Sequence, residues 1–278
     1  MGIDGKTQLV GIIANPIAHV RTPQLFNESV ARQGLNAVCV PFHVLDNDVS
    51  RVLQGVGGAR NFIGMIVTIP YKERVIDFCA ELTETAKLVG SANVLRFDHE
   101  QGAWTGGNFD GEGFIAGLRG RGYDLRGKRV LLLGSGGAGK AIAYSVALEQ
   151  PAELVIYNRT MARAEELVKR LRSVAMLANV HIQAGDNDPA GFDVIINATS
   201  LGLHDNDEFP MPVERLLSGS LVCEAVVRNG NTPLLAAAEH KACNIHHGQH
   251  MLYGQIVQIS GFLGFDLRAE HVAHILGP

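Results

Sequence analysis

A glycine-rich segment follows an apolar run and has the spacing of a phosphate-binding loop. Residues 130–133, VLLL, lead directly into G-x-G-x-x-G, where a strand would turn into a helix. The residues of this loop are Gly134, Ser135, Gly136, Gly137, Ala138 and Gly139. Its glycines permit a tight turn, a close approach of the backbone to a pyrophosphate and close helix packing, while amides at the helix start face the phosphate charge. We expect a dinucleotide site, against the alternative of a loop that merely turns.

The residues after the next expected strand indicate which dinucleotide binds. An Asp or Glu about 20 positions beyond the first strand would bond a ribose 2′-hydroxyl and repel a 2′-phosphate. This position holds Asn158, and Arg159, Thr160 and Arg163 follow it. Two guanidinium groups and a hydroxyl can bind a 2′-phosphate, so the sequence predicts NADP. The alternative is that Arg163 is an exposed helix residue that pairs with Glu166 at i, i+3 spacing.

A further apolar run ends in residues 197–200, NATS. In a doubly wound sheet the loops at the carboxyl ends of the strands face the ligand. We therefore expect Ala198 and Thr199 to lie along the nicotinamide side of the dinucleotide.

Lys72 and Asp110 have the types and positions of a proton-transfer pair. Lys72 and Thr68 follow an apolar strand that turns at Pro70, which places them at the carboxyl end of that strand. Asp110 lies in a glycine-rich segment, beside any cleft between domains. An alcohol that loses a hydride must also lose a proton, and a lysine held near an aspartate can accept it. Both residues are also ordinary surface residues, so the pattern alone leaves two interpretations open.

Short apolar runs alternate with amphipathic stretches, which predicts an α/β fold in which helices cover a parallel sheet on both faces. The expected strands are 9–13, 37–42, 62–67, 129–133, 154–157, 193–196, 221–225 and 244–247. Expected helices include 114–121, 252–263 and 266–276. Residues 102–113 hold five glycines among mostly polar residues, so we expect an irregular segment between two domains. The second domain is expected to begin near residue 112.

The composition favours a compact enzyme that acts on a small molecule. With 278 residues, of which 46% are hydrophobic and 19% charged, the chain can bury the cores of two domains. The net charge of −4 gives no reason to expect nucleic acid or an anionic membrane as a partner. We expect a cytoplasmic protein, because the sequence shows neither a signal peptide nor a membrane span. Four cysteines without a C-x-x-C pair are expected to be buried free thiols.

Nine segments, in their order and spacing, resemble the shikimate dehydrogenase family along almost the whole chain. They are ANPIAH at 14–19, VTIPYK at 67–72, GSAN at 90–93, GGNFDGEG at 106–113, GSGGAGKA at 134–141, YNRT at 157–160, NATSLGL at 197–203, NTPLL at 231–235, and ML at 251–252 followed by Gln255. The resemblance implies a discontinuous α/β substrate-binding and catalytic domain, residues 1–111 plus about 252–278, and a Rossmann-like NADP-binding domain, residues 112–251.

The resemblance also implies the reaction and the roles of single residues. It implies an NADP-dependent interconversion of shikimate, or a closely related cyclic hydroxy acid, and its 3-dehydro ketone. Lys72 and Asp110 would form the catalytic pair. The residues implied at substrate hydroxyls are Thr68, Asn93 and Gln255. The implied partner is therefore a small cyclic carboxylate, and we expect a monomer or a homodimer.

Three departures from the family pattern concern the substrate pocket. Family members carry an S-x-S motif that holds the substrate carboxylate, whereas this chain has Val20, Arg21 and Thr22, so that Thr22 is the hydroxyl that remains. Ile66 replaces an Asn, and Val227 replaces a Tyr. Each lost hydrogen bond is worth about 0.5–1.5 kcal/mol, so shikimate binding should weaken. Arg21 either supplies a new carboxylate partner or points to solvent.

Two other functions stay open at this point. One is a quinate-preferring dehydrogenase, and the other is a ligand-sensing homologue that binds the dinucleotide without turnover. Retention of Lys72 and Asp110 argues against the sensor, and the altered carboxylate site argues for it. His246, His247 and His250 form an H-H-x-x-H run with His240 nearby, but no acidic residue adjoins this run, so we expect no metal site.

Overall fold

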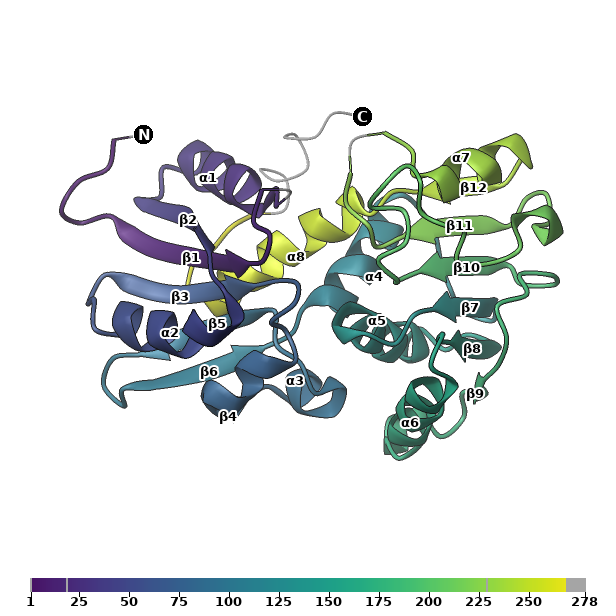
Figure 1. Ribbon diagram of the computed structural model, residues 1–278, viewed down its shortest axis with the longest axis horizontal. Helices are drawn as coiled ribbons and strands as arrows, with labels where there is room; N and C mark the ends of the chain where they lie inside the picture. Colours follow the sequence, from purple (N-terminus) through teal and green to yellow (C-terminus); the bar gives the residue numbers. More distant parts are fainter. Residues whose placement is uncertain (1, 19, 229, 269–278) are drawn as a thin grey trace. The chain divides into compact units, whose positions relative to one another are not determined.

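The chain forms two compact α/β units (Figure 1). The structure is a computed structural model that describes residues 2–18, 20–228 and 230–268. Unit 1 contains Met1–Phe109 and Gln255–Pro278, and unit 2 contains Asp110–Gly254. Unit 2 thus starts slightly before residue 112 and ends slightly after residue 251.

Unit 1 is built on a six-stranded sheet. Its strands are β1 (Gln8–Ala14), β2 (Ala37–His43), β3 (Phe62–Val67), β4 (Cys79–Leu82), β5 (Val94–Asp98) and β6 (Ala103–Gly107). The strand order is β2-β1-β3-β5-β6-β4. β1 is parallel to β2 and β3, and β4 is parallel to β6, whereas β5 is antiparallel to β3 and β6. This sheet is therefore mixed rather than all parallel.

The helices of unit 1 bury their apolar residues against this sheet. They are α1 (Thr22–Arg32), α2 (Val49–Gly57) and α3 (Glu84–Val89), with short 3-10 helices η1 (Asp46–Asp48) and η2 (Arg74–Phe78). Val49 and Leu53 of α2 belong to one buried cluster with Phe62 and Met65 of β3. Burying such a side chain stabilises the fold by about 1.5–3 kcal/mol.

Residues 102–113 contain a strand and the start of a helix, so the expectation of an irregular segment is wrong. β6 pairs with β5, and its Trp104 is buried with its ring centroid 4.8 Å from that of Phe97. A Cβ on Gly106 would lie 2.7 Å from Leu82 Cδ2, so glycine lets the neighbouring strand pack closely. α4 (Asp110–Gly120) begins at Asp110 rather than at residue 114. Pairing and packing here override the low strand propensity of glycine.

Unit 2 is built on a second six-stranded sheet, in which all neighbouring strands are parallel. Its strands are β7 (Arg129–Leu133), β8 (Glu153–Tyr157), β9 (Ile182–Ala184), β10 (Val194–Asn197), β11 (Leu221–Glu224) and β12 (Asn244–His246). The strand order is β12-β11-β10-β7-β8-β9. The chain enters the sheet at the central strand β7, adds β8 and β9 on one side, and then adds β10, β11 and β12 on the other side. This is the Rossmann order, in which ligands bind beyond the carboxyl ends of the strands at the reversal between β7 and β10.

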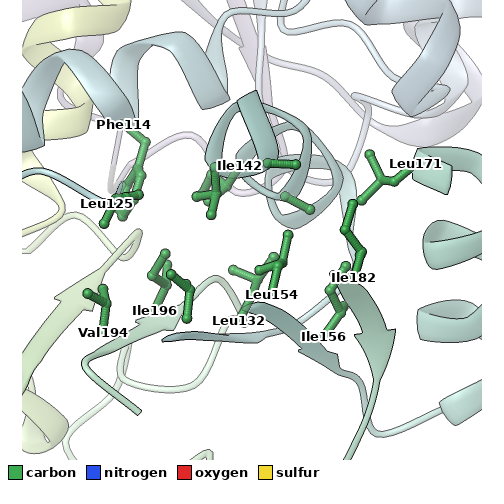
Figure 2. Close-up of a cluster of buried hydrophobic side chains, with 14 of the residues drawn as sticks. Phe114, Leu125, Leu132, Ile142, Leu154, Ile156, Leu171, Ile182, Val194 and Ile196 are labelled. Atoms are coloured by element: carbon green, nitrogen blue, oxygen red, sulfur yellow. The ribbon is translucent and has the colours of Figure 1, made fainter. Parts of the chain in front are cut away.

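Both faces of the unit 2 sheet are covered. The remaining helical elements are α5 (Gly137–Leu148), α6 (Met161–Arg172), η3 (Ala175–Leu177), η4 (Val213–Arg215), α7 (Pro233–His240) and α8 (Gln249–Phe262), which ends in unit 1. On one face Leu132 and Ile196 pack in a cluster with Phe114 of α4 and Ile142 of α5 (Figure 2). Residues that alternate with these along the strands pack with α7 on the other face.

The α/β fold is confirmed, and all eight expected strands are present, with each end within one residue of its expected position. β4, β5, β6 and β9 were not expected. The helix expected at 252–263 begins at Gln249. The helix expected at 266–276 lies largely outside the described residues, and Asp266–Arg268 is not helical. All four cysteines are free, but only Cys39 and Cys223 are buried.

Among the helices within the described residues, none combines the length and apolarity needed to span a membrane.

Candidate functional site

The glycine-rich loop of unit 2 forms a close backbone contact that side chains would prevent. Gly134 has a φ of +103°, and a Cβ there would lie 2.9 Å from the carbonyl group of Ala198. A Cβ on Gly139 would overlap the carbonyl oxygen of Gly134. α5 begins at Gly137, and no side chain caps its start at Gly136. The loop therefore has the shape and the helix N-terminus that a pyrophosphate needs.

Asn158, at the end of β8, fixes this loop to the neighbouring strand. Its Oδ1 accepts a hydrogen bond of 3.1 Å from the backbone N–H of Ser135. Its Nδ2 donates a hydrogen bond of 3.0 Å to the carbonyl oxygen of Thr160. Asn158 thus shapes the backbone on both sides of the predicted dinucleotide site.

Arg159 and Arg163 are exposed at the start of α6, and no ion pair joins either guanidinium to a described residue. Glu166 pairs with Arg170 at 2.6 Å, so the alternative pairing of Glu166 with Arg163 is wrong. The first turn of α6 carries no acidic residue. This corner of unit 2 therefore offers two cationic side chains and a helix N-terminus to an anion.

A network of side chains shapes the loop after β10. Asn197 is buried, and its Oδ1 accepts hydrogen bonds from the N–H of Thr199 at 3.1 Å and from its Oγ1 at 2.7 Å. Thr199 Oγ1 accepts in turn from the N–H of Leu201 at 3.1 Å. Sequence reasoning selected Ala198 and Thr199 but missed Asn197 as the centre of this loop. The signal was a polar residue at the end of a buried strand.

In unit 1, the residues expected at the substrate gather around the carboxyl end of β3. The backbone N–H of Thr68 donates to Ile13 at the end of β1, at 3.2 Å. Asn93 is buried, with its Oδ1 accepting from the N–H of Phe109 at 3.0 Å and its carbonyl accepting from Val67 at 2.8 Å. The carbonyl of Lys72, a half-buried residue, accepts from the N–H of Ala92 at 2.8 Å. Thr68, Lys72 and Asn93 therefore share one region of unit 1.

The remaining expected substrate residues come from helices. Thr22 is the first residue of α1 and is buried, whereas Arg21 precedes the helix and is exposed. Gln255 is buried on α8 and belongs to unit 1. His19 lies outside the described residues.

Asp110 is the first residue of α4, belongs to unit 2 and is fully buried. Its position follows from close helix packing, because a Cβ on the next residue, Gly111, would overlap the backbone of Ala141 in α5. Lys72 belongs to unit 1, so its pairing with Asp110 stays a prediction.

The side chains that replace polar residues of the family pattern are partly or fully buried. Ile66 in β3 is buried, and Val20 and Val227 are half-buried. Thr22 is the buried hydroxyl that remains beside Val20.

The histidine group packs as a set of aromatic rings. The buried ring of His246 lies with its centroid 4.9 Å from that of His250 and 6.0 Å from that of Phe114. Burial lowers the pKa of His246 to about 3 and that of His250 to about 4, so both are neutral at ordinary pH. In the part of the chain that the structure describes, no three His, Cys, Asp or Glu side chains are arranged to hold a metal ion.

Comparison with known proteins identifies the family. Residues 12–95 match the model of the shikimate dehydrogenase substrate binding domain, and residues 118–203 match that of shikimate / quinate 5-dehydrogenase. A relative from Rubrobacter xylanophilus, named shikimate dehydrogenase (NADP(+)), is 38% identical over 92% of this chain and 90% of its own.

Solved structures agree with this match. The structure of shikimate 5-dehydrogenase from Listeria monocytogenes, in complex with shikimate and NAD, is 30% identical, with a TM-score of 0.85 over 99% of this chain and 98% of its own. The ligand-free structure of 5-ketofructose reductase from a Gluconobacter species is 28% identical, with a TM-score of 0.82 over 98% of both chains. The chain therefore belongs to the shikimate dehydrogenase family of oxidoreductases.

Proposed function

We propose that this protein is an NADP-dependent dehydrogenase that interconverts shikimate, or a closely related cyclic hydroxy acid, and its 3-dehydro ketone. The observation that carries the proposal is the corner formed by the glycine loop, Arg159 and Arg163, in a chain whose relatives are named shikimate dehydrogenase (NADP(+)). The absence of a carboxylate after β8 removes the group that would repel a 2′-phosphate.

In this proposal unit 2 holds the dinucleotide and unit 1 holds the substrate. The glycine loop would bind the pyrophosphate, Arg159, Thr160 and Arg163 would bind the 2′-phosphate, and Ala198 and Thr199 would line the nicotinamide half. Bound NADP supplies the hydride acceptor. We infer a cytoplasmic enzyme that is a monomer or a homodimer.

Lys72 would exchange the proton of the reacting hydroxyl, with the carboxylate of Asp110 orienting its ammonium group. A lysine at this point can donate a hydrogen bond to the developing negative oxygen as well as a proton. Burial of Asp110 suits the role of a fixed carboxylate. Thr68, Asn93 and Gln255 would bind the other hydroxyls, and Thr22 with Arg21 would bind the substrate carboxylate.

A second candidate differs only in the substrate. Val20, Ile66 and Val227 present apolar groups in place of three hydrogen-bonding ones, which favours a substrate other than shikimate. Quinate, which carries the same carboxylate and one more hydroxyl, is the alternative to be tested. The 5-ketofructose reductase neighbour is a case of this fold with a different named substrate.

A panel of shikimate, quinate and an amino analogue, each with NADP and with NAD, tests the proposal. The absorbance of reduced nicotinamide should rise with NADP and one of these alcohols. If no alcohol reduces either cofactor while calorimetry shows tight dinucleotide binding, the protein is a sensor and the enzymatic proposal fails.

A further inference from the structure

A buried carboxyl group lies at the carboxyl end of β11, and the sequence pattern gave this residue no role. Glu224 is the last residue of β11, and its side chain is fully buried. Its Oε2 accepts a hydrogen bond of 3.0 Å from Asn197 Nδ2, and its Oε1 accepts one of 2.8 Å from Thr232 Oγ1. The backbone N–H of Val226 also donates to this carboxyl group.

These donors come from three different segments of unit 2. Asn197 ends β10, Val226 follows β11, and Thr232 caps the start of α7 by accepting from the N–H of Leu235 at 3.1 Å. A carboxylate accepts hydrogen bonds at both oxygens, which suits donors that arrive from several directions. Glu224 therefore joins two strand ends to one helix end.

The network continues from Glu224 to the loop expected at the nicotinamide. Asn197 Nδ2 donates to Glu224 and, at 2.9 Å, to the carbonyl oxygen of Leu201, and these two hydrogen bonds orient its Oδ1 toward both the N–H and the hydroxyl of Thr199. The backbone of Ala198 and Thr199 lies in turn against Gly134, where a Cβ would come within 3.0 Å of the Thr199 nitrogen. The carboxylate at residue 224 is thus one of two acceptors that fix the side-chain amide shaping this loop, and it is the one that lies outside the loop.

The position of the loop in the sheet indicates which part of the dinucleotide it meets. β7 and β8, with the glycine loop and Asn158, form the half of the sheet that binds the adenosine side. β10 and β11 belong to the second half, which takes the nicotinamide side. Building on the proposed function, we propose that Glu224 is a positioning residue that holds Ala198 and Thr199 in the shape required by the nicotinamide half of the dinucleotide.

Burying this carboxyl group is unfavourable, which argues against a purely structural role. Burial raises the pKa of Glu224 to about 7, although Thr232, Asn197, Val226 and Arg228 all act to lower it. A buried charge of this kind costs stability that an apolar residue at the same position would not. Such a cost is typical of positions selected for a site rather than for the fold.

The charged and titratable groups around Glu224 come from two neighbouring segments. Arg228 donates to the carbonyl of Gly202 at 3.3 Å and pairs with Asp205 at 2.7 Å. Asp207 accepts from the N–H of Gly202 at 2.9 Å, and Cys223 is the preceding residue, whose pKa is raised well above its usual value. Cys223 is therefore neutral, and Arg228 is the cation that favours ionised Glu224.

The test is Glu224→Gln, in which an amide replaces the carboxylate without a change of size. Its Nε2 is a donor and cannot accept from the donors that meet Glu224. We expect the dissociation constant of NADPH, measured by its fluorescence, to rise about tenfold at pH 8, because charge-assisted hydrogen bonds are lost. The KM for the cyclic alcohol should stay within about twofold, since unit 1 is unchanged.

A pH series separates positioning from general destabilisation. Glutamine resembles the protonated acid, so the ratio of the NADPH dissociation constants of variant and wild type should fall toward one as the pH drops below about 7. The ratio cancels titration of the cofactor phosphate. A constant ratio across this range would overturn the proposal.

Glu153→Gln is the matched control. Glu153 lies at the opposite, amino end of the same sheet, where it pairs with Arg129 at 2.9 Å. This variant should bind NADPH like the wild type, and equal losses in both variants would contradict a positioning role.

If Glu224→Gln fails to fold, Thr199→Val is the second variant, because it removes the hydroxyl at the end of the network. Unchanged NADPH binding in Thr199→Val would overturn the proposal. Direct binding needs no turnover, so these outcomes are distinct from failure of the proposed reaction.

Discussion

The two units carry their expected functional residues in different ways. In unit 2 the glycine loop, Asn158–Arg159 and Ala198–Thr199 follow the carboxyl ends of three parallel strands, each as a short continuous motif. In unit 1 the expected substrate residues come from separate segments, namely the start of α1, the end of β3, the segment before β5 and helix α8. The apolar replacements Val20 and Ile66 both lie in unit 1, and Val227 lies in unit 2.

This difference follows from what each unit has to recognise. A pyrophosphate is bound largely by backbone amides, so the sequence must supply glycines wherever a Cβ would overlap a neighbouring chain, as at Gly134 and Gly139. A hydroxyl or carboxylate of a substrate is bound by single side chains, each worth about 0.5–1.5 kcal/mol. The cofactor site is therefore constrained as a whole, whereas the substrate site can change one side chain at a time.

The largest expected effect separates catalysis from binding. Lys72→Ala should lower kcat by about 10²–10⁴-fold, because a positioned proton donor and acceptor is lost. NADPH binding should be unchanged, since Lys72 belongs to unit 1. Stopped-flow or steady-state kinetics and NADPH fluorescence measure the two quantities.

Lys87→Ala is the control for this variant, because Lys87 is an exposed residue of α3 that pairs with Glu84. It should retain full activity. If Lys72→Ala keeps more than about a tenth of the wild-type kcat, Lys72 is not the proton-transfer group.

The sequence was most informative where local pattern and tertiary structure agree. The eight expected strands are short apolar runs, most of them buried, and the edge strands β2 and β12 are partly exposed, so the pattern of apolar runs alone locates them. β6 escaped prediction because its glycines look unfavourable until the contacts of Leu82 and Trp104 are known. Glu224 was not predicted as a site residue because a charged residue at a strand end is usually exposed. Only the structure shows that its carboxyl group is buried among three hydrogen-bond donors.

A smaller effect is expected from Arg159, in the corner proposed to select the dinucleotide. Arg159→Ala should raise the KM for NADP by about 10–100-fold and leave the KM for NAD nearly unchanged, because only NADP carries the 2′-phosphate. Arg170→Ala is a matched control, since Arg170 lies on α6, the helix that follows Arg159, and pairs with Glu166. Equal changes in the KM for NADP and the KM for NAD would show that Arg159 does not bind the 2′-phosphate.

The smallest effect should appear at a single substrate contact. Val20→Ser restores one hydroxyl beside Thr22, so the KM for shikimate should fall by about 2–10-fold while the KM for NADP stays constant. Val40→Ser, on the exposed edge strand β2, makes the same chemical change away from the site and should alter neither constant. An unchanged or higher KM for shikimate in Val20→Ser would mean that residue 20 does not face the substrate carboxylate. The loss of the second hydroxyl would then not explain any change of substrate, and Ile66 or Val227 would have to account for it.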